Sequence, residues 1–460
     1  MANISIGARL DRLPITRLHK KATLLIGTGI FFDLFDIFLA GVLSTVLVEQ
    51  FHIDEKWLPL LLASGFLGMF IGAIVLGGLA DRFGRKKAFM YNLAIYSIFS
   101  LLAAFSPNVG LLIFFRFVAG LGLGAEPPLC DAYLSELLPA SQRGRYVAWA
   151  YTLAFLAMPV EGILAKILVP VQLFGLEGWR LLFIIGSAGS LIVWVWRMHL
   201  PESPRWLEAA GRLEEANQIA VQMEDEAKAL GELKPVQSTT PRQTPVASFS
   251  VLWQKRYRRY TLMLWFFHIL QTIGYYGFGT LVPLILKAKG YTILHSLEYT
   301  ALTFLGYPLG SLLSLPLVER IDRKWLIVLS AFLMAVFGIS FGMANLPSLI
   351  VIFGFLYTLV SNVFSNAFHI YQAEIFPTSV RATAAGSSYS LSRLMSGLMP
   401  FMLLPVLNHY GSAAMFSVVA VAMGLIMVDI GLFGPRSTGR SLEDVNGEER
   451  GSETGFKNRM

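Results

Sequence analysis

Two aspartates lie three residues apart inside an otherwise apolar and aromatic run, FFDLFDIFLAG at residues 31–41. Asp33 and Asp36 fall near the middle of a segment long enough to cross a membrane. An aspartate at the centre of a membrane helix costs about 2.5 to 3.5 kcal/mol on insertion scales, so such residues are usually kept for a task. We therefore expect these aspartates to take up and release protons or to contact a substrate.

Other charged residues within apolar segments could act with these aspartates. Arg116, in the fourth apolar segment, falls at a membrane level similar to that of Asp36 if both helices rise 1.5 Å per residue. A buried acid that alternates between contact with an arginine and separation from it can act as a proton switch. A permanent ion pair that fixes two helices is the alternative. Glu126 and Glu161 are further candidates for proton coupling.

Composition indicates a membrane protein. The 460 residues are 55% hydrophobic and 15% charged, against about 25% charged in soluble domains. The net charge of +7 does not indicate a nucleic-acid partner, because the basic surplus lies in short segments between apolar runs. The single cysteine, Cys130, excludes an intramolecular disulfide and a thiolate metal cluster. We expect a multi-pass protein of the inner (plasma) membrane, a monomer with no cofactor and no metal.

Twelve apolar runs are long enough to be membrane-spanning helices, so the sequence predicts an all-α membrane protein with twelve transmembrane helices. Lysine and arginine cluster in alternate connections, which predicts that both termini are cytoplasmic. The predicted spans are approximately 22–48, 58–80, 88–105, 109–135, 146–170, 180–199, 261–286, 297–318, 326–344, 349–371, 387–408 and 412–433.

The chain is predicted to contain two six-helix bundles, at 1–200 and 261–434. The stretch 201–260 between them is a cytoplasmic linker, and its first part, 206–230, has the apolar spacing of one amphipathic helix. Its middle, residues 234–248, is rich in Pro, Ser and Thr and is expected to be flexible. The polar tail, 435–460, is expected to be disordered.

An internal repeat relates the two bundles. Residues 65–74, 81–87 and 133–143 match residues 303–312, 319–325 and 371–381, with a constant offset of 238. Two pseudo-symmetric six-helix halves of this kind are the architecture of secondary transporters, which work by alternating access.

The sequence GGLADRFGRKK, residues 77–87, resembles the loop between the second and third spans of the major facilitator superfamily. In that superfamily the aspartate and the arginines of the loop pair across the cytoplasmic ends of helices. These pairs latch the outward-open state. Asp322 stands where the repeat has Gly84, so the second latch is expected to be weaker. The resemblance implies a cytoplasmic gate formed by Asp81, Arg82, Arg85 and Arg143 in the first half and Glu319, Arg323, Glu374 and Arg381 in the second.

Further motifs resemble the sugar-porter branch of this superfamily, among them PESPRWL at 201–207 and GWR at 178–180. In related porters an aspartate of the first span and an arginine of the fourth couple proton movement, and they match Asp36 and Arg116. The seventh span, HILQTIGYYGFGTLVP, has fewer amides and more aromatic rings than sugar porters carry. With the aspartate pair, it looks like the metabolite:proton symporters, which include transporters of nicotinate and benzoate-type acids.

Polar and aromatic residues of the second half could bind such an acid. Arg393 could hold a carboxylate, although an anchor at a helix end is an equal alternative. The others could stack on and hydrogen-bond a small ring, and core packing would explain any single one. The candidate substrate-binding residues are His268, Gln271, Tyr275, Tyr276, Asn362, Asn366 and Arg393.

The glycine cluster around Gly120 and Gly124 is expected to allow close helix packing, because no strand precedes it as a dinucleotide-binding loop would require. No nucleophile and base occur at a usable spacing, so an enzyme is not expected, and a membrane receptor is a minor alternative.

The predicted function is proton-coupled import of a small organic acid, such as nicotinate or another aromatic monocarboxylate. A sugar or polyol porter is the main alternative. One proton with a monoanion is electroneutral and follows the pH gradient, at about 1.36 kcal/mol per pH unit. One proton with a neutral sugar also responds to the membrane potential, at about 2.3 kcal/mol per 100 mV.

Overall fold

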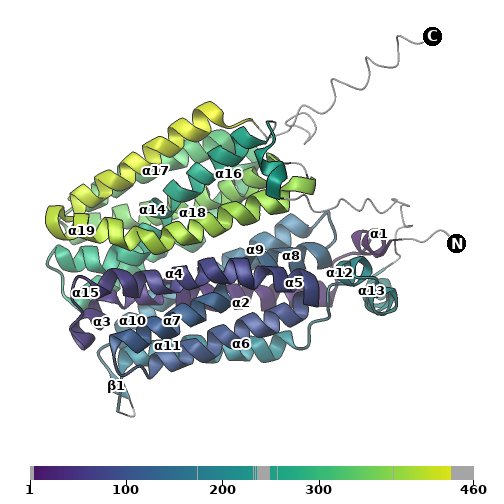
Figure 1. Cartoon of the computed structure of the whole chain (residues 1–460), viewed down its shortest axis with the longest axis horizontal. Coiled ribbons are helices and arrows are strands. Elements are labelled where there is room, and N and C mark those ends of the chain that lie inside the picture. Colours follow the sequence, from purple (N-terminus) through teal and green to yellow (C-terminus); the bar gives the residue numbers. More distant parts are fainter. Residues whose placement is uncertain are drawn as a thin grey trace, which may run out of the picture. The chain divides into compact units, whose positions relative to one another are not determined.

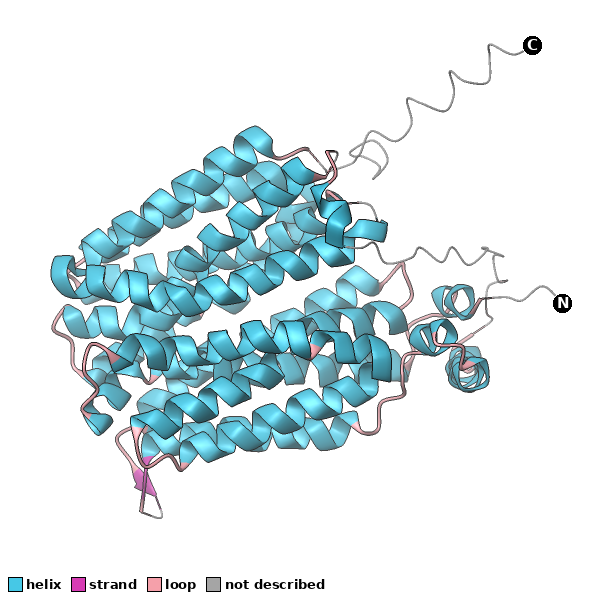
Figure 2. Ribbon diagram, in the orientation of Figure 1, coloured by secondary structure: helices cyan, strands magenta, loops and turns pink. Residues whose placement is uncertain are grey.

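The computed structural model describes residues 5–173, 175–231, 233, 235, 249–255, 257–376 and 378–436. Most of the predicted flexible linker at 234–248 and of the predicted disordered tail at 435–460 lies outside the described residues. The chain divides into two compact units, residues 1–243 (unit 1) and 244–460 (unit 2). Each unit is built of long helices, and the described strands form one small hairpin (Figures 1 and 2).

Unit 1 contains the first six predicted spans and three short helices outside them. Its elements are α1 (Ile6–Asp11), α2 (Arg17–Val42), α3 (Ser44–Phe51), α4 (Trp57–Val75), α5 (Gly77–Phe83), α6 (Arg85–Ala104), α7 (Val109–Gly124), α8 (Glu126–Leu137), α9 (Arg143–Phe155), α10 (Ala157–Leu168), β1 (Gln172–Leu173), β2 (Leu176–Glu177), α11 (Gly178–Arg197), α12 (Pro204–Ala209) and α13 (Leu213–Lys228). Strands β1 and β2 pair antiparallel.

Unit 2 contains the last six predicted spans. Its elements are the 3₁₀ helix η1 (Phe249–Trp253), α14 (Arg258–Ala288), α15 (Ile293–Phe304), α16 (Gly306–Arg320), α17 (Arg323–Met343), α18 (Pro347–Glu374) and α19 (Thr378–Phe433).

The predicted spans are present, and several are interrupted. The span at 109–135 is α7 and α8, which separate at Ala125, two residues before Pro127. The span at 146–170 is α9 and α10, which separate at Leu156 before Pro159. Proline lacks the N–H and its ring crowds the preceding turn, so a break near it is expected. These breaks bring Glu126 and Glu161 close to helix N-termini inside the membrane segment.

The last two spans form one long helical segment with a turn inside it. Eleven described helical segments are long and apolar enough to cross a membrane, and the last of them, Thr383–Phe433, has 51 residues. A straight helix of that length would be about 77 Å long, more than twice the thickness of a bilayer core. Gly411, with φ of 79° and ψ of 179°, breaks it at the predicted boundary between spans eleven and twelve. The structure therefore has the predicted twelve spans.

Glycines repeat the same helix contact in the two units. A Cβ on Gly68 or Gly72 of α4 would lie 2.0 Å from the carbonyl oxygen of Phe117 or Leu121 on α7. In unit 2, Gly310 of α16 faces the carbonyl oxygen of Leu359 on α18 at 2.1 Å. These partners are again 238 residues apart. The backbones approach closely only because the glycines of α4 and α16 lack a side chain. The same contact in both units confirms the two pseudo-symmetric halves at the level of packing.

The glycines of α7 pack as predicted. A Cβ on Gly120 would lie 2.2 Å from the carbonyl oxygen of Gly65, and one on Gly124 would lie 2.2 Å from that of Met69. Both contacts are with α4. The glycine cluster therefore serves close helix packing.

Short helices lie at one end of unit 1, opposite the end that carries the hairpin (Figure 1). The prediction of one helix over 206–230 is wrong, because Gly211, with φ of 78°, separates α12 from α13. Helix α1, which packs on α13, was not predicted from the sequence. Arg9 and Arg12 of the α1 segment donate to the carboxylate of Glu224 on α13 at 2.7 and 2.8 Å. These ion pairs hold α1 against α13, and Arg205 of α12 lies 2.7 Å from Asp11 of α1.

Candidate functional site

Asp36 and Arg116 lie together in the interior of unit 1. Asp36 on α2 is 3% exposed and Arg116 on α7 is 4% exposed. Arg116 Nη1 lies 3.9 Å from Asp36 Oδ2, and Nη2 donates to the Asp36 backbone carbonyl at 3.2 Å. The hydroxyl of Ser100 on α6 donates to Asp36 Oδ1 at 2.5 Å. The pair is close and not in full contact, and Ser100 orients the carboxylate.

Glu161 is a second acid near this pair. It lies on α10 and is fully buried, and neither carboxylate oxygen has a hydrogen-bond partner among the described residues. The charges of Asp36 and Arg116 act on it. An unpaired buried carboxylate is costly to ionise, so the neutral acid is the form that this position accommodates.

Glu126 pairs with Arg197, an arginine that was not predicted as a site residue. Arg197, at the end of α11, is 1% exposed and Glu126 is equally buried. Its Nη1 donates to Glu126 Oε1. The sequence places Arg197 just before PESPRWL at the predicted end of a span, where an arginine is expected to reach water. The only indication of this pairing in the sequence is that a buried Glu126 needs a positively charged partner.

Asp33 lies near this second pair. It is 1% exposed and neither carboxylate oxygen has a hydrogen-bond partner in the described chain. The charges of Glu126, Arg197 and Asp36 act on it. The two aspartates of FFDLFDIFLAG therefore lie with different arginines, Asp36 with Arg116 and Asp33 with Arg197, although they are three residues apart on one helix.

Arg393 on α19 is a buried charged residue in the interior of unit 2. It is 7% exposed, and its guanidinium lies over the rings of Tyr276 at 4.7 Å and Tyr389 at 4.5 Å. Its Nε and Nη1 have no hydrogen-bond partner among the described residues. Tyr275 packs edge-on against Tyr276, with ring centroids 5.0 Å apart. Tyr389, which lies one turn before Arg393 on α19, was not among the residues predicted from the sequence.

The predicted amide ligands already donate to protein groups. Asn362 Nδ2 donates to the Tyr307 carbonyl at 2.6 Å, and Asn366 Nδ2 donates to Ser314 Oγ at 2.7 Å. Gln271 Nε2 donates to Ser392 Oγ at 3.1 Å.

His268 lies in an aromatic setting on α14. Its Nε2 lies 3.2 Å from Gln372 Oε1, and its ring packs edge-on against Phe368 at 4.9 Å. No group of three or more His, Cys, Asp or Glu side chains that could hold a metal ion occurs in the described part of the chain.

Gate residues form ion pairs at equivalent places in the two units. Arg85 Nη2 lies 2.8 Å from Glu136 Oε1, and Arg323 Nε lies 3.4 Å from Glu374 Oε1. Arg143 lies 3.9 Å from Asp11. Glu136 was not among the predicted gate residues, although the repeat offset of 238 aligns it with Glu374.

The other predicted gate residues are exposed or incompletely described. Arg82 and Glu319 are exposed, and Arg82 lies over the ring of Phe83. The side chains of Asp81 and Arg381 lie outside the described residues.

The helices that follow the two gate loops begin differently. Gly84 has φ of 102°, and the carboxylate of Glu202 accepts from the backbone N–H of Arg85 at 2.9 Å and of Lys86 at 3.1 Å. A Cβ on Gly84 would lie 2.3 Å from Glu202 Oε2. In unit 2 the residue at the same repeat position, Asp322, accepts from the Lys324 N–H at 3.0 Å. In unit 1 the helix cap is therefore Glu202 of the distant PESPRWL motif, whereas in unit 2 it is Asp322, the residue directly before the helix.

Comparison with known proteins defines the class. Two inverted or paired six-helix halves with buried charges are typical of secondary transporters. The partially occluded inward-open structure of the xylose transporter XylE from E. coli has a TM-score of 0.73 at 20% identity, covering 92% of this chain and 99% of that one. This likeness confirms the twelve-helix fold of the major facilitator superfamily.

Sequence relatives define the family. The family described as "Sugar (and other) transporter" matches residues 24–448. The putative metabolite transport protein YyaJ of Bacillus subtilis (strain 168) is 35% identical over 91% of this chain and 90% of its own. The niacin transporter NiaP of Acinetobacter baylyi is 30% identical over 95% of this chain and 99% of its own. The chain therefore belongs to the sugar (and other) transporter family.

Proposed function

We propose that this protein is a proton-coupled symporter that imports a small organic acid, most suitably an aromatic or heteroaromatic monocarboxylate such as nicotinate. It would lie in the inner membrane as a monomer with both termini in the cytoplasm. The similarity to a protein named as a niacin transporter supports the substrate class. The clustering of basic residues in alternate connections supports the orientation.

The observation that carries the proposal is the environment of Arg393. A buried guanidinium, two of whose nitrogens have no hydrogen-bond partner in the described part of the chain, lies against the rings of Tyr276 and Tyr389. A carboxylate gains charge-assisted hydrogen bonds from such a group, and an attached aromatic ring can pack against the tyrosines. Arg393, Tyr275 and Tyr276 are therefore the proposed core of the substrate site.

The amides support an acid better than a sugar. A sugar needs several free donors and acceptors, because each buried hydroxyl must be satisfied. The donors of Gln271, Asn362 and Asn366 are engaged with protein groups. These residues and His268 would shape the site, and the Asn362 carbonyl oxygen is a buried acceptor without a hydrogen-bond partner among the described residues.

Proton coupling is assigned to the buried charges of unit 1. The Asp36 to Arg116 separation of 3.9 Å is short enough for attraction and long enough for the pair to open. Glu161 lies beside it without a partner in the described chain. A proton on this cluster offsets charge when the site closes, so that proton and substrate move together. Asp33 and Glu126 complete the proposed coupling residues.

The gate is proposed to operate through the helix-end ion pairs. Breaking Arg85–Glu136 and Arg323–Glu374 would free the ends of α6 and α8 and of α17 and α18. Arg143 would contribute to the same latch. The resemblance to the superfamily assigns four further residues to it: Asp81, Arg82, Glu319 and Arg381.

Uptake into proteoliposomes tests the function. Labelled nicotinate, benzoate and a hexose are supplied with an inward proton gradient, and equal potassium with valinomycin holds the membrane potential at zero. We expect both acids to accumulate and the hexose not to. The Arg393→Gln variant should lose acid uptake, while Arg259→Gln, which removes an exposed arginine of α14, should retain it. Accumulation of the hexose alone would show that the sugar porter is the correct alternative.

A further inference from the structure

Unit 1 contains two charge clusters with the same composition. The first consists of Asp36, Arg116 and Glu161, and the second of Glu126, Arg197 and Asp33. Each has two carboxylates and one guanidinium. In each, one acid pairs with the arginine, and both oxygens of the other acid have no hydrogen-bond partner among the described residues.

Charge counting gives both clusters the same requirement. Two ionised carboxylates and one guanidinium leave a net charge of −1, which is costly in a dry protein interior. One proton shared by the two acids makes each cluster neutral. The proton belongs to the cluster as a unit, because strongly interacting acids titrate together.

The second cluster is built tightly around Arg197. Its Nη1 donates to Glu126, and Nη2 lies 3.4 Å from the Ile26 carbonyl on α2 and 3.8 Å from Cys130 Sγ on α8. A Cβ on Gly29 would lie 1.8 Å from Nη2, so only glycine leaves room for the guanidinium against α2. Gly29 is four residues before Asp33, one turn along the same face. The sequence thus makes space for a buried arginine beside Asp33.

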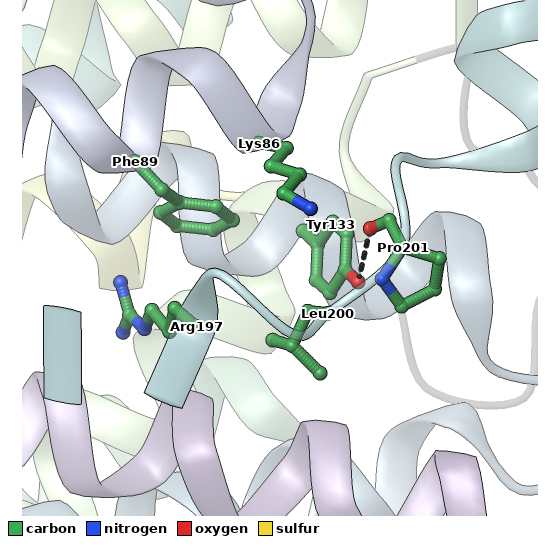
Figure 3. Close-up of a pocket in the computed structure, with 6 residues that line it drawn as sticks. All are labelled: Lys86, Phe89, Tyr133, Arg197, Leu200 and Pro201. Carbon is green, nitrogen blue, oxygen red and sulfur yellow. Dashed lines mark hydrogen bonds between the residues drawn. The ribbon is translucent and has the colours of Figure 1, made fainter. Parts of the chain in front are cut away.

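Arg197 also contacts the segment that caps the gate loop. Its guanidinium lies over the ring of Phe89 at 4.7 Å, and Phe89 packs edge-on against Tyr133 at 5.5 Å. The Tyr133 hydroxyl donates to the Pro201 carbonyl at 2.9 Å (Figure 3). The next residue, Glu202, caps the helix that begins at Arg85. A chain of contacts therefore joins the buried acids to the gate loop.

We propose that Asp33, Glu126 and Arg197 form a second proton-binding site, separate from the Asp36–Arg116 site, and that Arg197 is a positioning residue that links its occupancy to the gate loop. The proposal rests on the proposed proton-coupled transport and extends it to two protons for each substrate. Asp33 accepts a proton from the outer water, and the site releases it to the cytoplasm when the unit opens inward. Import of a monoanion then moves one net positive charge inward.

The titratable and charged groups around Asp33 come from several helices. Tyr96 of α6 donates to the Phe32 carbonyl, and Tyr151 of α9 donates to Asp131 rather than to Asp33. The groups whose charges bear on the site are Asp36 from α2, Glu126 and Cys130 from α8, Tyr96 from α6 and Arg197 from α11.

The steady-state accumulation of nicotinate measures the stoichiometry. At zero membrane potential and a gradient of one pH unit, each coupled proton multiplies the accumulation ratio by about ten. We expect about hundredfold accumulation by the natural protein and about tenfold by Asp33→Asn. With no pH gradient, about 59 mV, negative inside, should give tenfold accumulation by the natural protein and none by Asp33→Asn. Asp131→Asn, a change on the same helix as Glu126, is the matched control and should retain the hundredfold ratio.

The outcomes separate this inference from the proposed function. Tenfold accumulation by the natural protein, or hundredfold by Asp33→Asn, overturns the second proton site and leaves acid symport standing. No accumulation of any acid overturns the proposed function. In that case the infrared band of protonated carboxyl groups in purified protein at neutral pH still tests the site, because Asp33→Asn should remove part of it. An unchanged band overturns the proposal.

Arg197→Lys tests the link to the gate loop. Lysine keeps the charge count, so the steady-state ratio should stay near hundredfold. It lacks the planar group that packs on Phe89, so the initial rate should fall severalfold. An unchanged rate would remove Arg197 from the gate connection, and a tenfold steady-state ratio would contradict the charge count.

Discussion

In unit 1 the interior of the fourth span carries charges, and in unit 2 the equivalent span carries none of them. With the repeat offset of 238, Gly354 is the residue equivalent to Arg116, and Phe364 is the residue equivalent to Glu126. Phe364 stacks on Phe267 with ring centroids 5.3 Å apart, whereas Glu126 pairs with Arg197. Meanwhile the glycines that bring the paired helices together are retained in both units. The repeat therefore preserved backbone packing and allowed the interior chemistry to diverge, in keeping with the proposed proton site in one unit and the proposed substrate site in the other.

Removal of Arg197 should have the largest effect on stability. Arg197→Leu leaves Glu126 buried without its cation, which costs about 3 to 5 kcal/mol. The thermal unfolding midpoint in detergent measures this loss. The double variant Glu126→Leu with Arg197→Leu should recover most of it, since no charge is then left unpaired. A single variant as stable as the natural protein would mean that the charge difference between the units has little energetic weight.

Substitution of the packing glycines should affect both units alike. Gly72→Ala and Gly310→Ala each place a Cβ about 2 Å from a facing carbonyl oxygen, so the helices must separate. We expect a loss of about 1 to 3 kcal/mol in each case, measured as the midpoint of unfolding. Ala73→Gly, at a neighbouring position, serves as a control for helix propensity. Clearly unequal losses of stability would show that the helix packing at Gly72 and Gly310 is not equivalent.

The two gate loops should respond differently to alanine. Gly84→Ala forces an L residue to φ of 102° and crowds Glu202, at a cost of about 1 to 3 kcal/mol. Asp322→Ala removes a helix cap, at about 1 kcal/mol. Unfolding midpoints compare the two, with Asp322→Asn as the control that keeps capping. Equal losses would mean that the different caps do not distinguish the loops.

Protonation of Glu224 should have the smallest effect. Burial raises its pKa, but hydrogen bonds and charges from Arg9 and Arg12 more than offset this, so the folded-state pKa is lowered. The stabilisation is therefore complete above about pH 5 and is lost as the pH falls through the folded-state pKa. The fluorescence of a probe on α1, followed against pH, should show release of α1 in acid. Glu224→Gln should show the released signal at neutral pH, and an unchanged signal would contradict the assigned contact.

The fold could be predicted almost entirely from the sequence, because its determinants are local. Apolar length defines a span, and the constant repeat offset defines two halves. The missed features have the opposite character. The separation of α12 from α13 needs one positive φ at Gly211, and α1 is too short to have a clear periodicity. Its helix is held by contacts with α13, more than 200 residues later.

The candidate site was predicted in part. The pairing of Asp36 with Arg116 follows from equal depth in two helices, which can be computed from the rise per residue. Arg197 could not be predicted in this way, because a position near a span end is compatible with water contact. The length of an arginine side chain and the space left at Gly29 decide that it turns inward.

The sequence by itself determined the number of spans, the two halves, the family and the residue types available for proton and substrate chemistry. These depend on hydrophobicity and on local motifs. Only the tertiary structure decided the other partners: Asp33 and Glu126 with Arg197, Arg393 against two tyrosines, and the amides bonded to protein. Such partners come from different helices, and their distances depend on how closely the backbones pack.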